Sequence, residues 1–335
     1  MTQIKMKTPA MEPSLAMRAL KLVVLTALLG YVGYGLHNQA EALSGALTLR
    51  MLAALAAAVL CLLLNQVAMA CRQSLLLSHV GSPLPMGQSL RIILAGLFAN
   101  NFMPAGVGHD VARMVFLRGH HQQTTASLGG LVLLDRFLGL MGLSVLAACS
   151  LLTLWNWYPL AVPGEAGRLL ISAMLMPLPL GLTILALRHE ATFERLSGLA
   201  GRLPLGGKIQ NLLVGMRAFS SRKRVLLMAL GLASLGYVFA VAGVALLAWG
   251  VSDFQGAIGS TLVSPLVFFA SSIPVTPSNL GWTEAVADAA WNIFGMHGGM
   301  VVFIYWRIAT GITSLLGYST YCSYLNSTLE LNNDR

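Results

Sequence analysis

The sequence predicts an all-α polytopic membrane protein, and three observations lead to this fold class. Of its 335 residues, 56% are hydrophobic and only 10% are charged, which is more apolar surface than a soluble domain of this size can bury. The hydrophobic residues gather in runs of about 20, the length of helix that crosses about 30 Å of hydrocarbon. Short basic segments separate these runs, as loops do in membrane proteins. We therefore expect one membrane domain over residues 1–335.

Six of the apolar runs are long enough to be complete spans. They cover residues 16–36, 51–70, 127–154, 167–187, 225–249 and 300–321. Two further runs, residues 89–102 and 257–273, are shorter and end in proline and glycine, which interrupt helices. Helix breaks at membrane depth are tolerated only inside protein or beside water. The sequence thus predicts two broken or re-entrant helical hairpins in addition to the six spans.

The order of these elements repeats along the chain. Residues 16–155 give span, span, hairpin and span, and residues 165–325 give the same order from the opposite starting side. This is an inverted-topology repeat, an arrangement common in secondary transporters. The connector between the repeats, residues 189–224, has seven basic and two acidic residues. The positive-inside rule therefore places the connector and both chain termini in the cytoplasm.

The formal net charge of +9 follows from such loop residues. They lie between apolar runs and not in one basic patch with aromatic residues, so contact with anionic headgroups is expected and nucleic acid is not. Within the connector, residues 191–202 and 208–220 fit either an interfacial amphipathic helix or a solvated linker. Arg50 and Arg168 run against the charge rule, because the span count places both near the outer surface.

Two matching motifs mark the expected hairpin tips. Proline ends a helix and glycine permits close approach, so the freed backbone groups must face protein, water or a ligand. Two such tips would bring helix termini together, which suits charged headgroup atoms. The alternative is that proline and glycine merely kink two packed helices. The motif residues are Asn101, Pro104, Gly106, Gly108 and Asp110 in the first half, and Pro277, Gly281 and Glu284 in the second.

Charged residues at membrane depth supply the remaining candidates for the site. Asp135 and Arg136 lie inside the third predicted span, where they either lock the bundle by pairing or also contact a charged headgroup. Arg113 follows Asp110 by three positions, so on a helix the two would share a face and could pair. Together Asp110, Arg113 and Arg136 form a cytoplasm-facing group that could hold a phosphate.

The second half offers Glu284, Asp288 and Arg307 as counterparts. Glu284 and Asp288 lie four residues apart on a helix and would repel each other unless one is protonated or both face a cation. The pair hints at proton or cation linkage.

Patterns typical of enzymes and metal sites are missing from the sequence. His109, His120 and His121 fit no metal-ligand spacing, and the four cysteines are far apart without a CxxC. There is no GxSxG, P-loop or HExxH sequence. We expect neither a metal nor any other cofactor, and no enzyme activity.

The motifs resemble the flippase-like membrane domain of lysylphosphatidylglycerol synthases. The residues that carry the resemblance are Asn101, the stretch from Pro104 to Asp110, Arg113, Asp135, Arg136, the stretch from Pro277 to Gly281, and Glu284. The resemblance implies a bundle of inverted repeats with re-entrant helices that moves a lipid or lipid-linked headgroup between leaflets. Because the chain ends at Arg335, without room for an aminoacyltransferase domain, we expect a stand-alone member that makes no aminoacylated lipid itself.

The leading hypothesis is therefore a lipid flippase or transporter of the bacterial inner membrane. Its expected partner is a membrane lipid with an anionic or phosphate-bearing headgroup, and a homo-oligomer stays open. One alternative is a membrane-embedded enzyme that modifies a lipid headgroup, with Asp110 or Glu284 as general base. Another is a scaffold for an envelope lipid or glycan synthase.

Overall fold

The computed structural model describes residues 48–102, 108–120, 125–157, 189–201, 206–220, 222–252, 254–273 and 275–323, with positions 30, 175, 181 and 182. Every regular element in this part of the chain is helical. The elements are α3 (Leu49–His79), α4 (Met86–Phe102), α5 (Gly108–His120), α6 (Thr125–Trp157), α9 (Glu190–Gly201), α10 (Gly206–Ser220), α11 (Lys223–Val251), α12 (Phe254–Ser271), the 3-10 helix η1 (Pro277–Asn279), α13 (Trp282–Ile293) and α14 (Gly299–Leu315).

Three of the described helices are long and apolar enough to cross a membrane. They are α3, the segment Leu128–Leu154 of α6, and α11, and they confirm the helices predicted at residues 51–70, 127–154 and 225–249. The chain is a multi-pass membrane protein. The spans predicted at residues 16–36 and 167–187 fall outside the described residues, apart from isolated positions.

The helix predicted at residues 300–321 is shorter than expected. α14 ends at Leu315, a turn follows at Leu316 and Gly317, and a final helical segment covers residues 318–323. The break lies where Gly317 packs on α4 so closely that a Cβ atom there would overlap the Leu94 carbonyl group. Hydropathy could not reveal this interruption because it is caused by a contact between distant segments.

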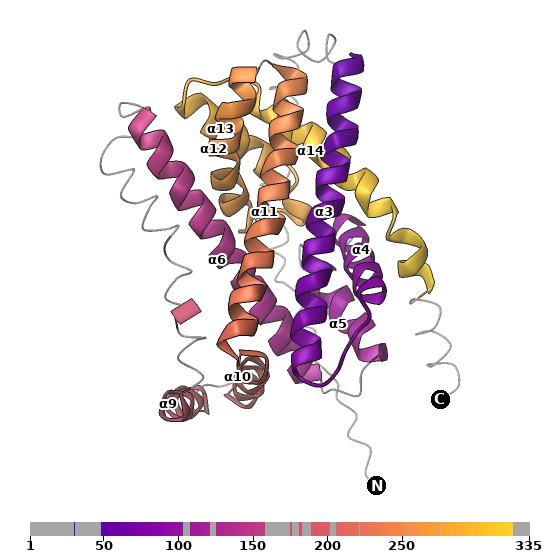
Figure 1. Cartoon of the computed structure of the whole chain (residues 1–335), viewed down its shortest axis with the longest axis vertical. Coiled ribbons are helices and arrows are strands. Elements are labelled where there is room, and N and C mark those ends of the chain that lie inside the picture. The colour runs from indigo at the N-terminus through magenta and orange to yellow at the C-terminus, as the bar shows by residue number, and fades with distance from the viewer. Residues whose placement is uncertain are drawn as a thin grey trace.

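The two helical hairpins lie in opposite halves of the bundle (Figure 1). α3 runs toward the end marked by α9 and α10, the α4–α5 hairpin occupies the half near that end, and α6 returns. α11 then runs away from α9 and α10, the α12–α13 hairpin occupies the far half, and α14 runs back. Asn65 on α3 donates from Nδ2 to the Gly236 carbonyl at 2.7 Å, which ties α3 to α11 near the middle of both helices.

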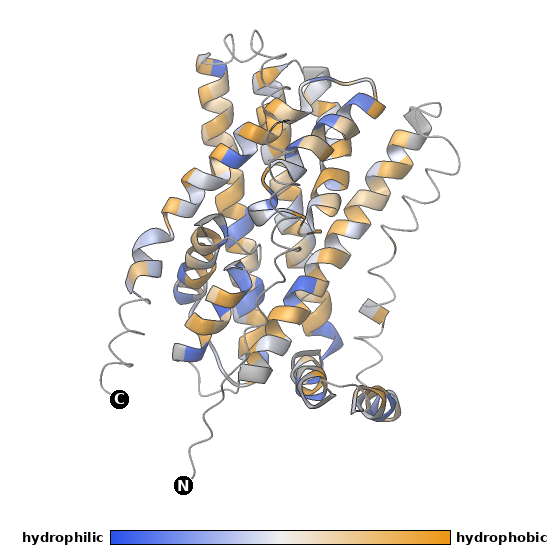
Figure 2. Ribbon diagram, turned by 180° about the vertical axis from the view of Figure 1, so that it is seen from behind, coloured by the Kyte–Doolittle hydropathy of each residue, from blue (hydrophilic) through white to orange (hydrophobic). Residues whose placement is uncertain are grey.

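Each hairpin has its own apolar core. One buried cluster surrounds α12 and α13 and includes Trp291 and Phe303, while the other surrounds α4 and α5 and includes Ile92 and Leu131. Hydrophilic segments interrupt the largely hydrophobic ribbons, chiefly in the half that holds α4 and α5 (Figure 2). Burying polar groups is costly unless they are paired, so we expect paired polar side chains inside that half.

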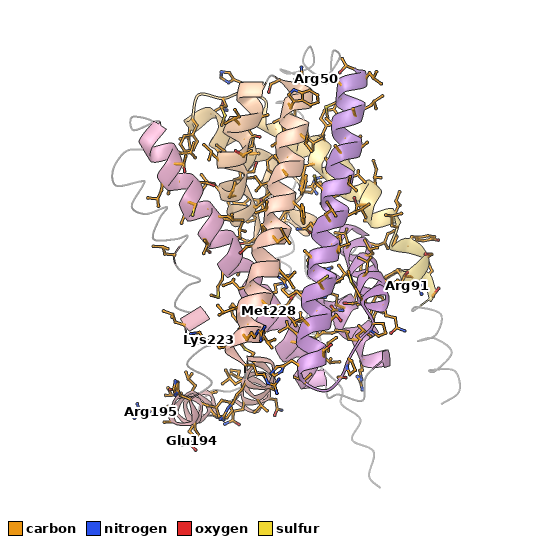
Figure 3. All side chains as sticks on the ribbon, viewed as in Figure 1. Arg50, Arg91, Glu194, Arg195, Lys223 and Met228 are labelled. Atoms are coloured by element: carbon orange, nitrogen blue, oxygen red, sulfur yellow. The ribbon has the colours of Figure 1, made fainter. Side chains whose placement is uncertain are left out.

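The connector forms two helices, α9 and α10, which lie across the long axis of the bundle (Figure 1). They are tied together by the Gln210 Nε2 bond to the Ser197 carbonyl at 2.9 Å and by Arg217 over the Phe193 ring at 4.4 Å. Glu194 and Arg195 point away from the bundle (Figure 3). This part of the chain is therefore helical, which favours the interfacial-helix interpretation over the solvated linker.

Candidate functional site

Asp135 is the centre of a buried ionic network in the half that contains α4 and α5. Its Oδ1 accepts from Arg72 Nε at 2.5 Å and its Oδ2 accepts from Arg113 Nη1 at 2.9 Å. The three residues come from α3, α5 and α6, and each is at most 4% exposed. One carboxylate thus joins three helices inside the bundle.

Further hydrogen bonds, to Gln73 and from it to Ser89, fix the Arg113 side chain. Gln73 Oε1 accepts from Arg113 Nε at 3.0 Å and from Nη2 at 2.7 Å, and Gln73 Nε2 donates to Ser89 Oγ at 3.0 Å. Ser89 in turn donates to the Ala70 carbonyl at 3.0 Å. With partners on Nε, Nη1 and Nη2, Arg113 is held in one orientation and bridges α3, α5 and α6.

The charges of this network do not cancel. Arg72 and Arg113 bring two positive charges and Asp135 brings one negative charge, so one positive charge is in excess. Removing one partner of a buried ion pair leaves an uncompensated charge, which is far more costly than losing an exposed pair. Asp135 is therefore required to keep two guanidinium groups at this depth.

Asp110 and Arg136 form a separate pair between α5 and α6. Arg136 Nε donates to Asp110 Oδ2, and the side chains are 44% and 17% exposed, respectively. The pair between Asp110 and Arg113 that their spacing allowed is not the one observed, since each residue binds a partner on α6 instead. Local helix spacing favoured the pair, but α6 supplies both a carboxylate and a guanidinium at adjacent positions.

Gly96 on α4 makes this arrangement of α5 possible. A Cβ atom at Gly96 would lie 2.7 Å from His109 Cδ2 and 3.2 Å from Arg113 Cγ. Because that space is open, α5 packs close against α4 while Arg113 reaches Asp135. His109 Nδ1 lies 3.7 Å from Asp110 Oδ1.

The second hairpin holds an ion pair at its tip. Arg307 Nε on α14 donates to Glu284 Oε1 on α13 at 2.5 Å, and its other nitrogens donate to the carbonyls of Ser278 at 3.2 Å and Asn279 at 3.1 Å. Glu284 is 4% exposed by its side chain, whereas Arg307 is 32% exposed. Arg307 thereby satisfies carbonyl groups that the broken helix frees.

The backbone of this tip departs from helical geometry. Ser278 and Asn279 have φ values of 52° and 51°, in the left-handed region, and Gly281 precedes α13 with φ of 78°. Asn279 Nδ2 donates to the Ser271 carbonyl, and Thr276 Oγ1 donates to the Leu280 carbonyl at 2.8 Å. Non-glycine residues rarely adopt this region, and such strain persists only where surrounding contacts fix it.

The two hairpin tips touch each other. Ser278 Oγ donates to the carbonyl oxygen of Asn100, in the last turn of α4, at 2.7 Å. The residues are 178 positions apart in sequence. The two proline-containing motifs thus belong to segments that meet inside the bundle.

Several polar atoms near the second tip have no partner among the described residues. These buried atoms are Glu284 Oε2, Asn279 Oδ1 and Ser271 Oγ, and His109 Nε2 in the other half shares this property. Of the two neighbouring acids, Glu284 pairs with Arg307, and Asp288 Oδ2 accepts from Asn292 Nδ2 at 3.4 Å.

The remaining sequence candidates lie at helix ends. Asn101 is in the last turn of α4, Gly108 begins α5 and is buried, and Pro277 begins η1. Pro104 and Gly106 fall outside the described residues. Across the described part of the chain, no group of three or more His, Cys, Asp and Glu side chains could hold a metal ion.

Sequence reasoning missed Arg72, Gln73 and Ser89. Arg72 and Gln73 follow the predicted span 51–70, and we assigned them no role. The signal was the apolar stretch Leu75 to Leu77, which shows that the helix continues beyond them to His79. A span extended to that point would have contained two polar residues at adjacent positions.

Comparison with known families agrees with this architecture. The sequence model described as the lysylphosphatidylglycerol synthase TM region matches residues 18–317. The chain belongs to this family. Comparisons with curated proteins and with solved structures found no match. In this member of the lysylphosphatidylglycerol synthase TM family, both hairpins and all the arginine–carboxylate pairs described above lie within the matched residues.

Proposed function

We propose that the protein moves a phosphate-bearing lipid headgroup between the leaflets of a bacterial inner membrane. The observation that supports this most is the contact between two broken-helix tips, each backed by an arginine–carboxylate pair. Membership of a family named for the membrane region of a lipid synthase agrees with a lipid as the substrate.

An inverted repeat accounts for the order of the helices. α3, the α4–α5 hairpin and α6 correspond to α11, the α12–α13 hairpin and α14, with the running directions reversed (Figure 1). The predicted spans at residues 16–36 and 167–187 would complete the halves. In inverted repeats, discontinuous helices meet near the bilayer midplane and form the substrate site.

Among the arginines that pair with Asp110 and Asp135, Arg136 is the one that a headgroup could reach. Its side chain is 44% exposed, whereas that of Arg113 is 1% exposed and already bound to Gln73 and Asp135. Arginine binds phosphate through paired N–H donors. We assign phosphate capture to Arg136, orientation of its guanidinium to Asp110, and a positioning role to Arg113.

Arg307 provides the corresponding contact in the other half. A headgroup that reaches the tips would compete with Glu284 and with two backbone carbonyls for this partly exposed guanidinium. Exchange of one acceptor for another lets a polar group pass without exposing a bare charge to hydrocarbon.

The end carrying α9 and α10 is assigned to the cytoplasm. Basic residues gather in and after these helices, at Arg195, Arg217, Arg222, Lys223 and Arg224, and the positive-inside rule places such segments inside. Arg195 and Lys223 lie at this end in Figure 3. The α4–α5 hairpin would then be entered from the cytoplasm and the α12–α13 hairpin from outside.

Proteoliposomes test the proposal directly. Purified protein is reconstituted with fluorescently labelled phospholipids of several headgroups, and transfer is followed by quenching of the label in the outer leaflet. Arg136→Gln and Glu284→Gln should abolish protein-dependent transfer while the purified variants remain folded, as shown by cooperative thermal unfolding. Arg91→Gln and Glu194→Gln, at exposed positions outside the site, are the matched controls.

Three results would count against the proposal. Wild-type transfer in both site variants would remove the roles assigned to these residues. A change in the mass of the lipid headgroup, without movement between leaflets, would indicate an enzyme instead. Co-purification of an envelope synthase with a protein inactive on every headgroup would indicate a scaffold.

A further inference from the structure

An apolar groove lies between α11 and α12, away from the ion pairs described above. Its volume is about 690 Å³, and its lining includes Ala242, Ala245, Leu246, Trp249, Ala257 and Ile258. These residues are at the end of α11 and the start of α12, far from α9 and α10 (Figure 1). Ligand pockets in proteins typically have volumes of roughly 300–1,000 Å³.

The groove faces outward from the bundle. Trp249 and Ile258 are 38% and 40% exposed, so the lining is not sealed by the described helices. α11 is apolar and long enough to span a membrane, and α12 contains the shorter apolar helix Gly256–Ser271. An outward apolar groove between such helices is open to hydrocarbon chains rather than to water.

Trp249 connects this groove to a cationic group. The centre of the Arg50 guanidinium lies 4.6 Å from the centroid of the Trp249 ring, which also lines the groove. Arg50 Nη2 donates to the carbonyls of Trp249 and of Ser252, the latter at 2.8 Å. Tryptophan and arginine at the end of a spanning helix are typical of the headgroup level.

Arg50 has donors left for an anion. A guanidinium carries five N–H groups in a planar fork, and the two bonds to α11 both use Nη2. Across the described residues, Nε and Nη1 have no hydrogen-bond acceptor. Nε and Nη1 lie on opposite edges of the guanidinium plane, so either can donate a single hydrogen bond to a phosphate oxygen.

We propose that the groove and Arg50 together form a binding site for a phospholipid of the leaflet at this end of the bundle. One acyl chain occupies the groove between α11 and α12, and the phosphate binds Arg50 above the Trp249 ring. The site goes beyond the proposed translocation, since it lies at the periphery and includes none of the residues assigned to transfer. It also gives a physical role to Arg50, which the charge rule left as an exception.

Cross-linking identifies what occupies the groove. A photoactivatable residue replaces Ile258 in protein reconstituted with phosphatidylglycerol and phosphatidylethanolamine, and the products are analysed by mass spectrometry. The expected product is the protein plus one phospholipid. Cross-links to a peptide from residues 1–47, or to a second copy of the chain, would overturn the proposal because protein would then fill the groove.

Substitutions test the two parts of the site by native mass spectrometry of lipid retention. Ala245→Trp fills the groove and should reduce retained phospholipid roughly tenfold, while Val238→Trp, at an exposed position of α11 outside the groove, should not. Equal retention in these two variants would contradict the acyl-chain assignment.

The headgroup contact is tested with diacylglycerol, which has the same chains and no phosphate. Arg50→Ala should lower retention of phosphatidylglycerol several-fold and leave that of diacylglycerol unchanged, and Arg50→Lys should restore only part of the loss, because lysine keeps the charge but not the planar group that stacks on Trp249. Equal losses for both lipids would show that Arg50 only supports the fold. Ala245→Trp should leave transfer in proteoliposomes active, which separates this proposal from the translocation proposal.

Discussion

The two hairpin sites satisfy their charged groups to different degrees. In the α4–α5 half, Asp135 binds two buried arginines, and both polar side-chain atoms of Gln73 have partners. In the α12–α13 half, Glu284 binds one partly exposed arginine and keeps Oε2 without a partner among the described residues. The first network is fixed by three helices, whereas the second depends on a strained tip. From this comparison we expect substitutions in the first site to destabilise the bundle more than substitutions in the second.

The largest expected effect is that of Asp135→Asn. The substitution removes the one carboxylate that pairs with both Arg72 and Arg113, so two buried guanidinium groups lose their counter-charge. We expect a loss of about 3–5 kcal/mol in the free energy of unfolding. Denaturant unfolding in detergent micelles measures this, with Ser144→Ala, a buried position on the same helix, as control. A loss below about 1 kcal/mol would contradict the structural role of the network.

Gln73→Leu should have the next largest effect. It deletes the acceptor of two Arg113 donors and the donor to Ser89, and hydrogen bonds to charged groups each contribute about 1.5–3 kcal/mol. The matched control is Gln66→Leu on the same helix, because Gln66 donates only to Asn65. Unfolding measured in the same micelles should show a clearly larger loss for Gln73. Equal losses would mean that the charge of Arg113 is not what makes Gln73 important.

Glu284→Gln should be milder than Asp135→Asn. Arg307 keeps its two carbonyl acceptors and remains partly exposed, so the loss should be about 1–2 kcal/mol. The two isosteric variants are compared side by side by the unfolding midpoint. If Glu284→Gln were as destabilising as Asp135→Asn, the distinction between a fixed and an adjustable site would fail.

The smallest expected effect concerns the contact between the tips. Ser278→Ala removes one hydrogen bond to Asn100 and should cost about 1 kcal/mol. Ser278→Gly removes the same bond but relieves the left-handed backbone, so it should recover about 0.5–1 kcal/mol. The difference between the two variants in thermal unfolding measures the strain at the tip, and identical stabilities would show that there is none to relieve.

Much of the helical framework could be predicted from the sequence, because an apolar run of about 20 residues indicates a helix that lies in the lipid bilayer. The same reasoning placed Asp135 and Arg136 inside a span, and Asp135 is buried there. The pairing of charges could not be predicted in this way. Helix spacing describes neighbours on one helix, whereas Asp110 and Arg113 find their partners on α6 because Gly96 sets the distance between α4 and α5.

The end of the first described span also lies beyond its predicted position. The charge of Arg72 interrupts the apolar run, yet the helix continues for seven further residues to His79 because leucines follow it. The break in α14 escaped prediction for a related reason. Glycine occurs throughout this apolar sequence, and only contact with another backbone shows which glycine interrupts a helix.

Gly317 has a mechanical consequence for the molecule. At that residue the C-terminal segment rests on α4, backbone against backbone, and no change of rotamer can absorb a displacement there. Beside the contact, the Phe98 ring packs between Tyr318 and Tyr321, with ring centroids 5.3 and 5.4 Å apart, respectively. This close contact couples the position of α4 to that of the C-terminal helical segment. If α4 moves, we expect residues 318–323 to move with it, and a spectroscopic label on Tyr321 would detect the displacement.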